Sequence, residues 1–231
     1  MGLHTALATA ATLVALAFAL SLYERWLANR HAHELAWTVA MAMFAVASGA
    51  LAAGAAVGWS PVLFRTFYLF GAVANVPILA LGTVFLLARW ETARRIGQVV
   101  VVAVAVAAGV IIAAPLRGAL PRDHLAQGSD VFGVLPRVLA AVASAGGALV
   151  VFGGALWSAL RQRRLVIANT LIALGTAVTG ASGVLNSVAD AMTGFAVTLV
   201  IGVTLIFVGF LVSATATSGA APSRPSSAAT H

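Results

Sequence analysis

The residues of this chain that could do acid–base chemistry are few, and each lies between apolar segments or at the end of one. The acids are Glu24, Glu34, Glu91, Asp123, Asp130 and Asp190. Proton relays and ion-coupled transporters place ionisable groups at mid-membrane depth, although a charge there costs about 2.5–3.5 kcal/mol. Because no acid or histidine of this chain falls at that depth, we predict no proton-coupled transport through a buried carboxylate.

Two groups of histidines and acids have the composition of a metal site. The first contains His31, His33 and Glu34, and the second contains His4, Asp123, His124, Asp130 and Asp190. Zinc sites need three or four ligands in a fixed geometry. The first group has no histidine pair at i, i+4, and the second is scattered along the chain. We interpret both as solvated connecting residues and predict no metal site and no cofactor.

Several classes of chemistry are excluded by what the sequence lacks. It has no P-loop, no dinucleotide fingerprint, no G-x-S-x-G and no H-E-x-x-H motif. Without cysteine there are no disulfides or thiolate nucleophiles, and without lysine no retinal Schiff base can form. We therefore predict that the chain is not an enzyme. The alternative, an enzyme, would have to use the second histidine–acid group.

Neutral polar residues do occur deep in the apolar segments, and these are the candidate ligand-binding residues. Tyr68, Asn75 and Gly82 repeat at sevens, and Pro77 follows Asn75 by two positions. Pro77 frees the carbonyl of Val73 and predicts a helix kink, beside which Asn75 could line a cavity. The alternative is that the Asn75 amide bridges neighbouring helices, a contact worth about 0.6 kcal/mol.

A second segment carries a similar set of residues. The sequence Ala-Leu-Gly-Thr occurs at both 80–83 and 173–176, and each copy follows an asparagine. Asn169 therefore corresponds to Asn75, and Thr176 to Thr83. An inverted repeat would explain the echo, and so would chance in a chain rich in these residues. The Gly54-x-x-x-Gly58 motif and the glycines at 194, 202 and 209 predict close helix packing.

The elements that must position these residues are apolar runs of about 20 residues, the length that crosses a hydrocarbon core. They cover 3–22, 35–57, 66–88, 96–114, 138–160, 165–185 and 194–213. Hydrophobic residues make up 61% of the chain and charged residues only 8%, too few for a water-facing surface. The fold class is therefore all-α: one domain of seven transmembrane helices over 1–213, followed by a short disordered cytoplasmic tail over 214–231.

Arginines indicate the orientation. The net charge of +7 comes from 13 basic residues, all arginine, and most follow the first, third and fifth segments. Since short cytoplasmic loops are rich in arginine, we predict an outside N-terminus and a cytoplasmic C-terminus. Membrane topology explains these charges, so we predict no nucleic-acid binding. The Ala- and Gly-rich composition favours a bacterial cytoplasmic membrane.

These features favour a non-enzymatic protein that binds a neutral or apolar small molecule, or a lipid, within the helix bundle. Asn75 and Asn169 would orient the ligand, Tyr68 would flank it and Thr176 would lie nearby, as in a sensor or a passive facilitator. Arg65 and Asp190 would pair as a gate at the outer end. The alternative is an accessory subunit that binds another membrane protein, or a copy of itself, without its own ligand.

Overall fold

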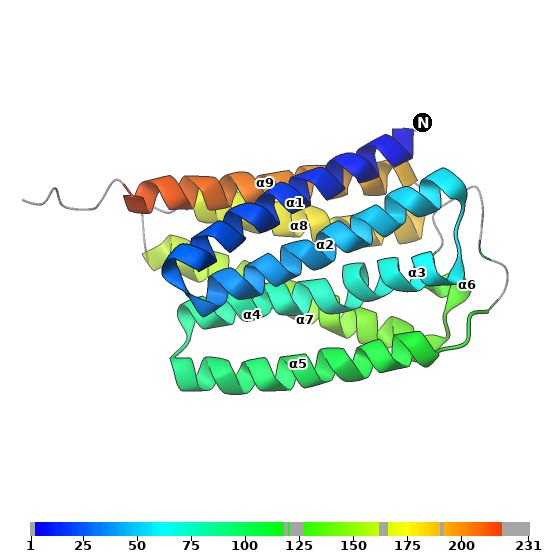
Figure 1. Cartoon of the computed structure of the whole chain (residues 1–231), viewed down its shortest axis with the longest axis horizontal. Coiled ribbons are helices and arrows are strands. Elements are labelled where there is room, and N and C mark those ends of the chain that lie inside the picture. Colours follow the sequence, from blue (N-terminus) through cyan, green and yellow to red (C-terminus); the bar gives the residue numbers. More distant parts are fainter. Residues whose placement is uncertain (1–2, 118–119, 121–126, 162–165, 190–191, 219–231) are drawn as a thin grey trace, which may run out of the picture.

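The computed structural model describes residues 3–117, 120, 127–161, 166–189 and 192–218. In this part of the chain the structure consists of helices and short connections, with no strand (Figure 1). The helices are α1 (Leu3–Asn29), α2 (Ala32–Val57), α3 (Pro61–Phe67), η1 (Tyr68–Ala74), α4 (Asn75–Leu87), α5 (Trp90–Ala113), α6 (Gly128–Val131), α7 (Val134–Arg161), α8 (Val166–Ala189) and α9 (Met192–Ser218). The predicted all-α bundle is confirmed.

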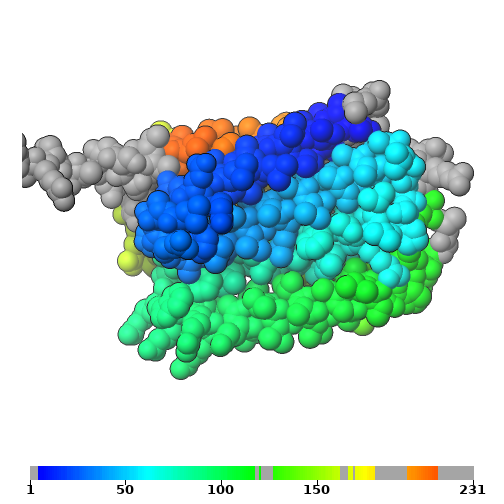
Figure 2. Space-filling model, viewed as in Figure 1, coloured from blue at the N-terminus to red at the C-terminus, as the bar shows by residue number. Residues whose placement is uncertain are grey.

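In the part of the chain that the structure describes, six helical segments form a ring. Around it, α1 packs against α2, α2 against α4, α4 against α7, α7 against α8, α8 against α9, and α9 against α1. The fourth long helix of the chain, α5, lies outside this ring against α4 and η1, at the lower edge of Figure 1. Figure 2 shows α1, α2, α3 and α5 lying across one face of the molecule.

The helix surfaces are those of a membrane protein. Among the described residues, five helices are long and apolar enough to cross a bilayer: α1, α2, the continuous α3–η1–α4 rod, α5 and α7. Shorter apolar stretches lie in α8 (Val166–Thr179) and α9 (Val197–Val212). On α5, Val99, Val102 and Val106 are more than 60% exposed, and their spacing places them on one outward stripe. The count of seven spans and the orientation stay predictions.

The connection between α1 and α2 is tight. α1 extends to Asn29, beyond the end predicted from the apolar run, and Arg30 then takes a positive φ of 57°. The Arg30 N–H donates to the Trp26 carbonyl at 2.7 Å, and its guanidinium lies 4.6 Å from the Trp26 ring centroid. This reversal folds the first turn of α2 back against the last turn of α1.

The connection between α2 and α3 corrects one prediction. Gly58, expected to belong to a packing seam with Gly54, instead ends α2 with a φ of 90°, and a Cβ there would meet nothing within 4 Å. Only Gly54 has a packing role, because a Cβ on it would lie 2.8 Å from the Trp59 ring. The side chain of Ser60 then caps α3 by accepting from the Leu63 N–H at 3.2 Å, with Pro61 at the first helical position.

The small residues of α8 and α9 do form a close seam, as the sequence predicts. A Cβ on Gly202 would lie 3.1 Å from the Gly175 carbonyl oxygen, and one on Gly209 would lie 2.7 Å from that of Ala168. Backbones this close allow van der Waals contact along both helices. The surroundings of Gly194 lie outside the described part.

Candidate functional site

Asn75 lies where the α3–η1–α4 rod changes its helical register. Its side chain is 6% exposed, and its Oδ1 has no hydrogen-bond partner within the described residues. The sequence allowed an interhelical bridge as the alternative use of this amide, and the described structure contains no such bridge through Oδ1. A buried acceptor without a partner costs about 1–3 kcal/mol, so this atom requires an explanation.

The segment before Asn75 is a π-helix of seven residues, Tyr68–Ala74. Pro77 lacks an N–H, which deprives the Val73 carbonyl of its partner in an α-helix and the Ala72 carbonyl of its partner in a π-helix. Ser144 of α7 replaces the missing donor, because its hydroxyl donates to the Ala72 carbonyl at 2.7 Å. Wide π-turns of this kind are frequent at functional sites.

Tyr68 belongs to an aromatic cluster at one end of the rod. Its ring lies 5.9 Å from Phe64 and 4.9 Å from Phe132, centroid to centroid. A Cβ on Gly128 would lie 2.6 Å from Tyr68 Cε2, so α6 packs directly onto this ring. The cluster closes one end of the bundle, a full π-helical segment away from Asn75.

Thr176 lines an open apolar groove between α7 and α8, about 370 Å³ in volume. The groove is otherwise lined by Ala145, Ala148, Leu149, Phe152 and Ala177. The Thr176 hydroxyl donates to the Ile172 carbonyl of its own helix at 2.8 Å, so its donor is already used. Because α7 lies between α4 and α8 in the ring, Thr176 and Asn75 belong to different helix seams.

The other predicted partners are described only in part. Asn169 is the fourth residue of α8, and its side chain lies outside the described part, as does Asp190. Arg65 is described: its guanidinium donates to the carbonyl of Ile112 and to that of Ala114, the latter at 2.8 Å. Arg65 thus ties α3 to the carboxyl end of α5, where the helix dipole favours a cation.

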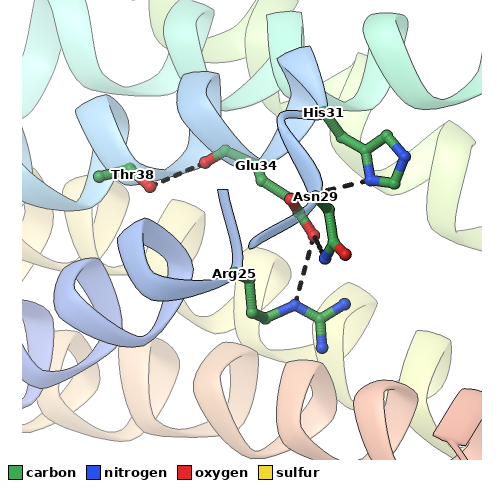
Figure 3. A network of polar contacts seen from close by, with 5 residues as sticks. All are labelled: Arg25, Asn29, His31, Glu34 and Thr38. Atoms are coloured by element: carbon green, nitrogen blue, oxygen red, sulfur yellow. Dashed lines mark hydrogen bonds and ion pairs between the residues drawn. The ribbon is translucent and has the colours of Figure 1, made fainter. Parts of the chain in front are cut away.

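The polar residues at the turn between α1 and α2 differ from their prediction (Figure 3). Glu34 was expected to be a solvated connecting residue, but it is the third residue of α2 and only 1% exposed. Its Oε1 accepts from Asn29 Nδ2 at 3.2 Å and lies 3.4 Å from Arg25 Nε. The sequence shows neither contact, because both depend on the reversal at Arg30 that folds α2 back onto α1.

Arg25 connects this turn to a third helix. Its guanidinium lies 5.0 Å from the ring centroid of Phe210 in α9, a cation–π distance. The buried Glu34 carboxylate is thereby compensated by a cation that also contacts α9. A buried acid without such compensation would be costly.

Comparison of the chain with protein-family models, with curated proteins and with solved structures finds no match.

Proposed function

We propose that this membrane protein is non-enzymatic and binds a neutral molecule beside Asn75, in the interior of its helix bundle. The observation that carries the proposal is the buried Asn75 Oδ1 without a hydrogen-bond partner. A carbonyl oxygen is an acceptor only, so the complementary group on the ligand is a donor such as a hydroxyl. The ligand is neutral, because the described part of the bundle interior offers no counter-charge at this depth.

The chemical class that fits is a lipid-like alcohol: an apolar body for the bundle and a hydroxyl group that donates to Asn75. The π-helical segment supports this proposal, since it displaces the backbone next to Asn75 from the regular α-helical path. Thr176 supplies no donor to a ligand, because its hydroxyl proton is already bonded to the Ile172 carbonyl. The groove that Thr176 lines is otherwise apolar and would take the apolar part of such a ligand.

The test uses the purified protein in detergent with 1-oleoylglycerol as the probe. We expect the probe to raise the melting temperature of the wild type and not that of Asn75→Leu. Without the probe, Asn75→Leu should melt within about 2–4 °C of the wild type, equivalent to about 1 kcal/mol for a chain of this size, because it removes an acceptor that makes no bond.

A matched control is Thr83→Val, which removes another buried polar group of α4 and should keep the full response to the probe. If the melting temperature of Asn75→Leu without the probe lies far below that of the wild type, Asn75 is a packing group and the proposal fails. If 1-oleoylglycerol does not raise the melting temperature of the wild type, the proposal that the ligand is a lipid-like alcohol is wrong.

The second candidate function, an accessory subunit, is favoured by an open face of α7. Gly146 and Gly153 are exposed, and a Cβ on either would meet nothing within 4 Å. They lie seven residues apart and so share one helix face, where another helix could approach closely. The partner would be another membrane protein or a second copy of this chain.

Native mass spectrometry of the detergent-solubilised protein tests the second copy. Gly146→Ile combined with Gly153→Ile should abolish a dimer, whereas Gly109→Ile, at another open glycine on α5, should leave it intact. A wild type that is monomeric throughout would exclude self-association through this face.

A further inference from the structure

The turn between α1 and α2 gathers three potential metal ligands within a small volume. One ligand atom each from His31, His33 and Glu34 lies within 4.8 Å of the other two. The two imidazole rings are nearly parallel, with centroids 5.2 Å apart and an interplanar angle of 14°. The grouping is a product of the fold as well as of the sequence, because Glu34 is buried with its carboxylate beside His31.

The two oxygens of Glu34 have different surroundings. Oε1 is held by Asn29 and lies beside Arg25. Oε2 is buried and has no hydrogen-bond partner, and it lies 3.8 Å from His31 Nδ1 (Figure 3). One oxygen therefore anchors the side chain, while the other remains available to a ligand on the side of the histidines.

The donor set suits a late first-row divalent cation. Two imidazole nitrogens and one carboxylate, with a water in the fourth position, is the pattern of three-ligand zinc sites. Bonds of about 2.0–2.1 Å to a tetrahedral ion would draw these atoms closer than they lie now. His31 can make that movement because its side chain is 60% exposed, whereas buried Glu34 provides the fixed point.

Two charges oppose a cation here and limit its affinity. Arg25 lies beside Oε1, and the amino end of α2 carries a positive partial charge. Arg25 is not aimed at Oε2, however, and its guanidinium is placed over Phe210. We propose that His31, His33 and Glu34 form a binding site for Zn²⁺ or a similar cation, which clamps the α1–α2 turn. This inference does not depend on ligand binding at Asn75.

Isothermal titration of the tag-free, EDTA-treated full chain with ZnCl₂ tests the proposal. We expect one saturable site in the wild type, and a rise in melting temperature on adding Zn²⁺. His31→Ala and His33→Ala should each weaken binding at least about tenfold, since even loss of an outer-shell partner costs 10–100-fold. Co²⁺ should give the visible absorption bands of a tetrahedral site, which these two variants should lack.

Two further variants keep the result interpretable. Glu34→Gln should also weaken binding, and its melting curve without metal reports whether it still folds. Because His31 is exposed, His31→Ala should fold in any case. His4→Ala, which removes a histidine outside the cluster, should bind Zn²⁺ as the wild type does. Absence of saturable Zn²⁺ binding, or binding unaffected by His31→Ala and His33→Ala, would overturn the proposal.

Discussion

The indole of Trp37 occupies the space that a side chain at position 82 would fill. A Cβ on Gly82 would overlap the Trp37 ring, and the Trp37 Nε1–H donates to the Leu79 carbonyl at 3.1 Å. The absence of a side chain at Gly82 thus lets Trp37 of α2 pack closely against α4. In that position the Leu79 carbonyl accepts the hydrogen bond from the indole N–H.

Gly82→Ala should therefore destabilise the bundle. Displacing a packed indole costs about 1–3 kcal/mol, as overpacking generally does, and the melting temperature should fall accordingly. Gly109→Ala is the matched control, because its Cβ would enter open space on α5. There the better helix propensity of alanine should leave stability unchanged or raise it by up to about 1 kcal/mol. Equal melting shifts for both variants would contradict the packing role of Gly82.

Ser144 and Pro77 should be energetically coupled. Ser144→Ala removes the donor to the Ala72 carbonyl and should cost about 1 kcal/mol. In a Pro77→Ala background the backbone regains an N–H, so the same substitution should cost less. A double-mutant cycle on melting free energies measures the difference. Ser21→Ala, which removes a hydroxyl bonded within its own helix, should show no coupling to Pro77. Strictly additive effects of Ser144→Ala and Pro77→Ala would show that the Ser144 hydroxyl does not replace the missing N–H.

Arg65→Ala should loosen the end of the bundle at which α5 terminates. The substitution removes the donors to the Ile112 and Ala114 carbonyls and should cost about 1.5–3 kcal/mol, the range for hydrogen bonds from charged groups. The predicted gate is tested by adding Asp190→Ala. If the two residues pair at the lip of the bundle, their coupling energy should exceed experimental error and reach at most about 1 kcal/mol. Additive melting shifts of the two substitutions would show that Arg65 does not pair with Asp190 and only holds the end of α5.

The orientation can be tested with two single cysteines in a chain that has none of its own. Ser129 in α6 and Thr92 at the start of α5 are both exposed and lie at opposite ends of α5. If the N-terminus is outside, an impermeant thiol reagent added to intact cells should label Ser129→Cys and spare Thr92→Cys. The reverse labelling would invert the topology, and after cell lysis both variants should react.

The all-helical fold could be read from the sequence because the bilayer imposes a simple rule. Long apolar runs must be helical, and the small residues of α8 and α9 lie on the faces that meet, as Gly202 and Gly209 do. The position of α5 outside the ring could not be predicted, since nothing in an apolar run states which neighbour it meets.

The sites were harder to predict, for two physical reasons. The burial of Glu34 depends on the positive φ of Arg30. The sequence does not indicate this conformation, because the residue is an arginine and not a glycine. The π-helical segment before Asn75 contacts a hydroxyl from Ser144, a residue far away in the sequence, which donates to the Ala72 carbonyl. Pro77 signals that a carbonyl is freed, but the fold decides which carbonyl and which donor replaces the missing N–H.

The ring of six helices also sets an order of assembly. Synthesis proceeds from the N-terminus, so helices enter the membrane one after another. The contact between α1 and α9, where Phe18 stacks on Phe207 at 4.8 Å and lies 5.2 Å from Phe210, joins the first of these helices to the last. Until α9 packs, Phe18 lacks its aromatic partners on α9, and Arg25, although already beside Glu34 of α2, lacks Phe210. The ring therefore closes only when α9 packs against α1.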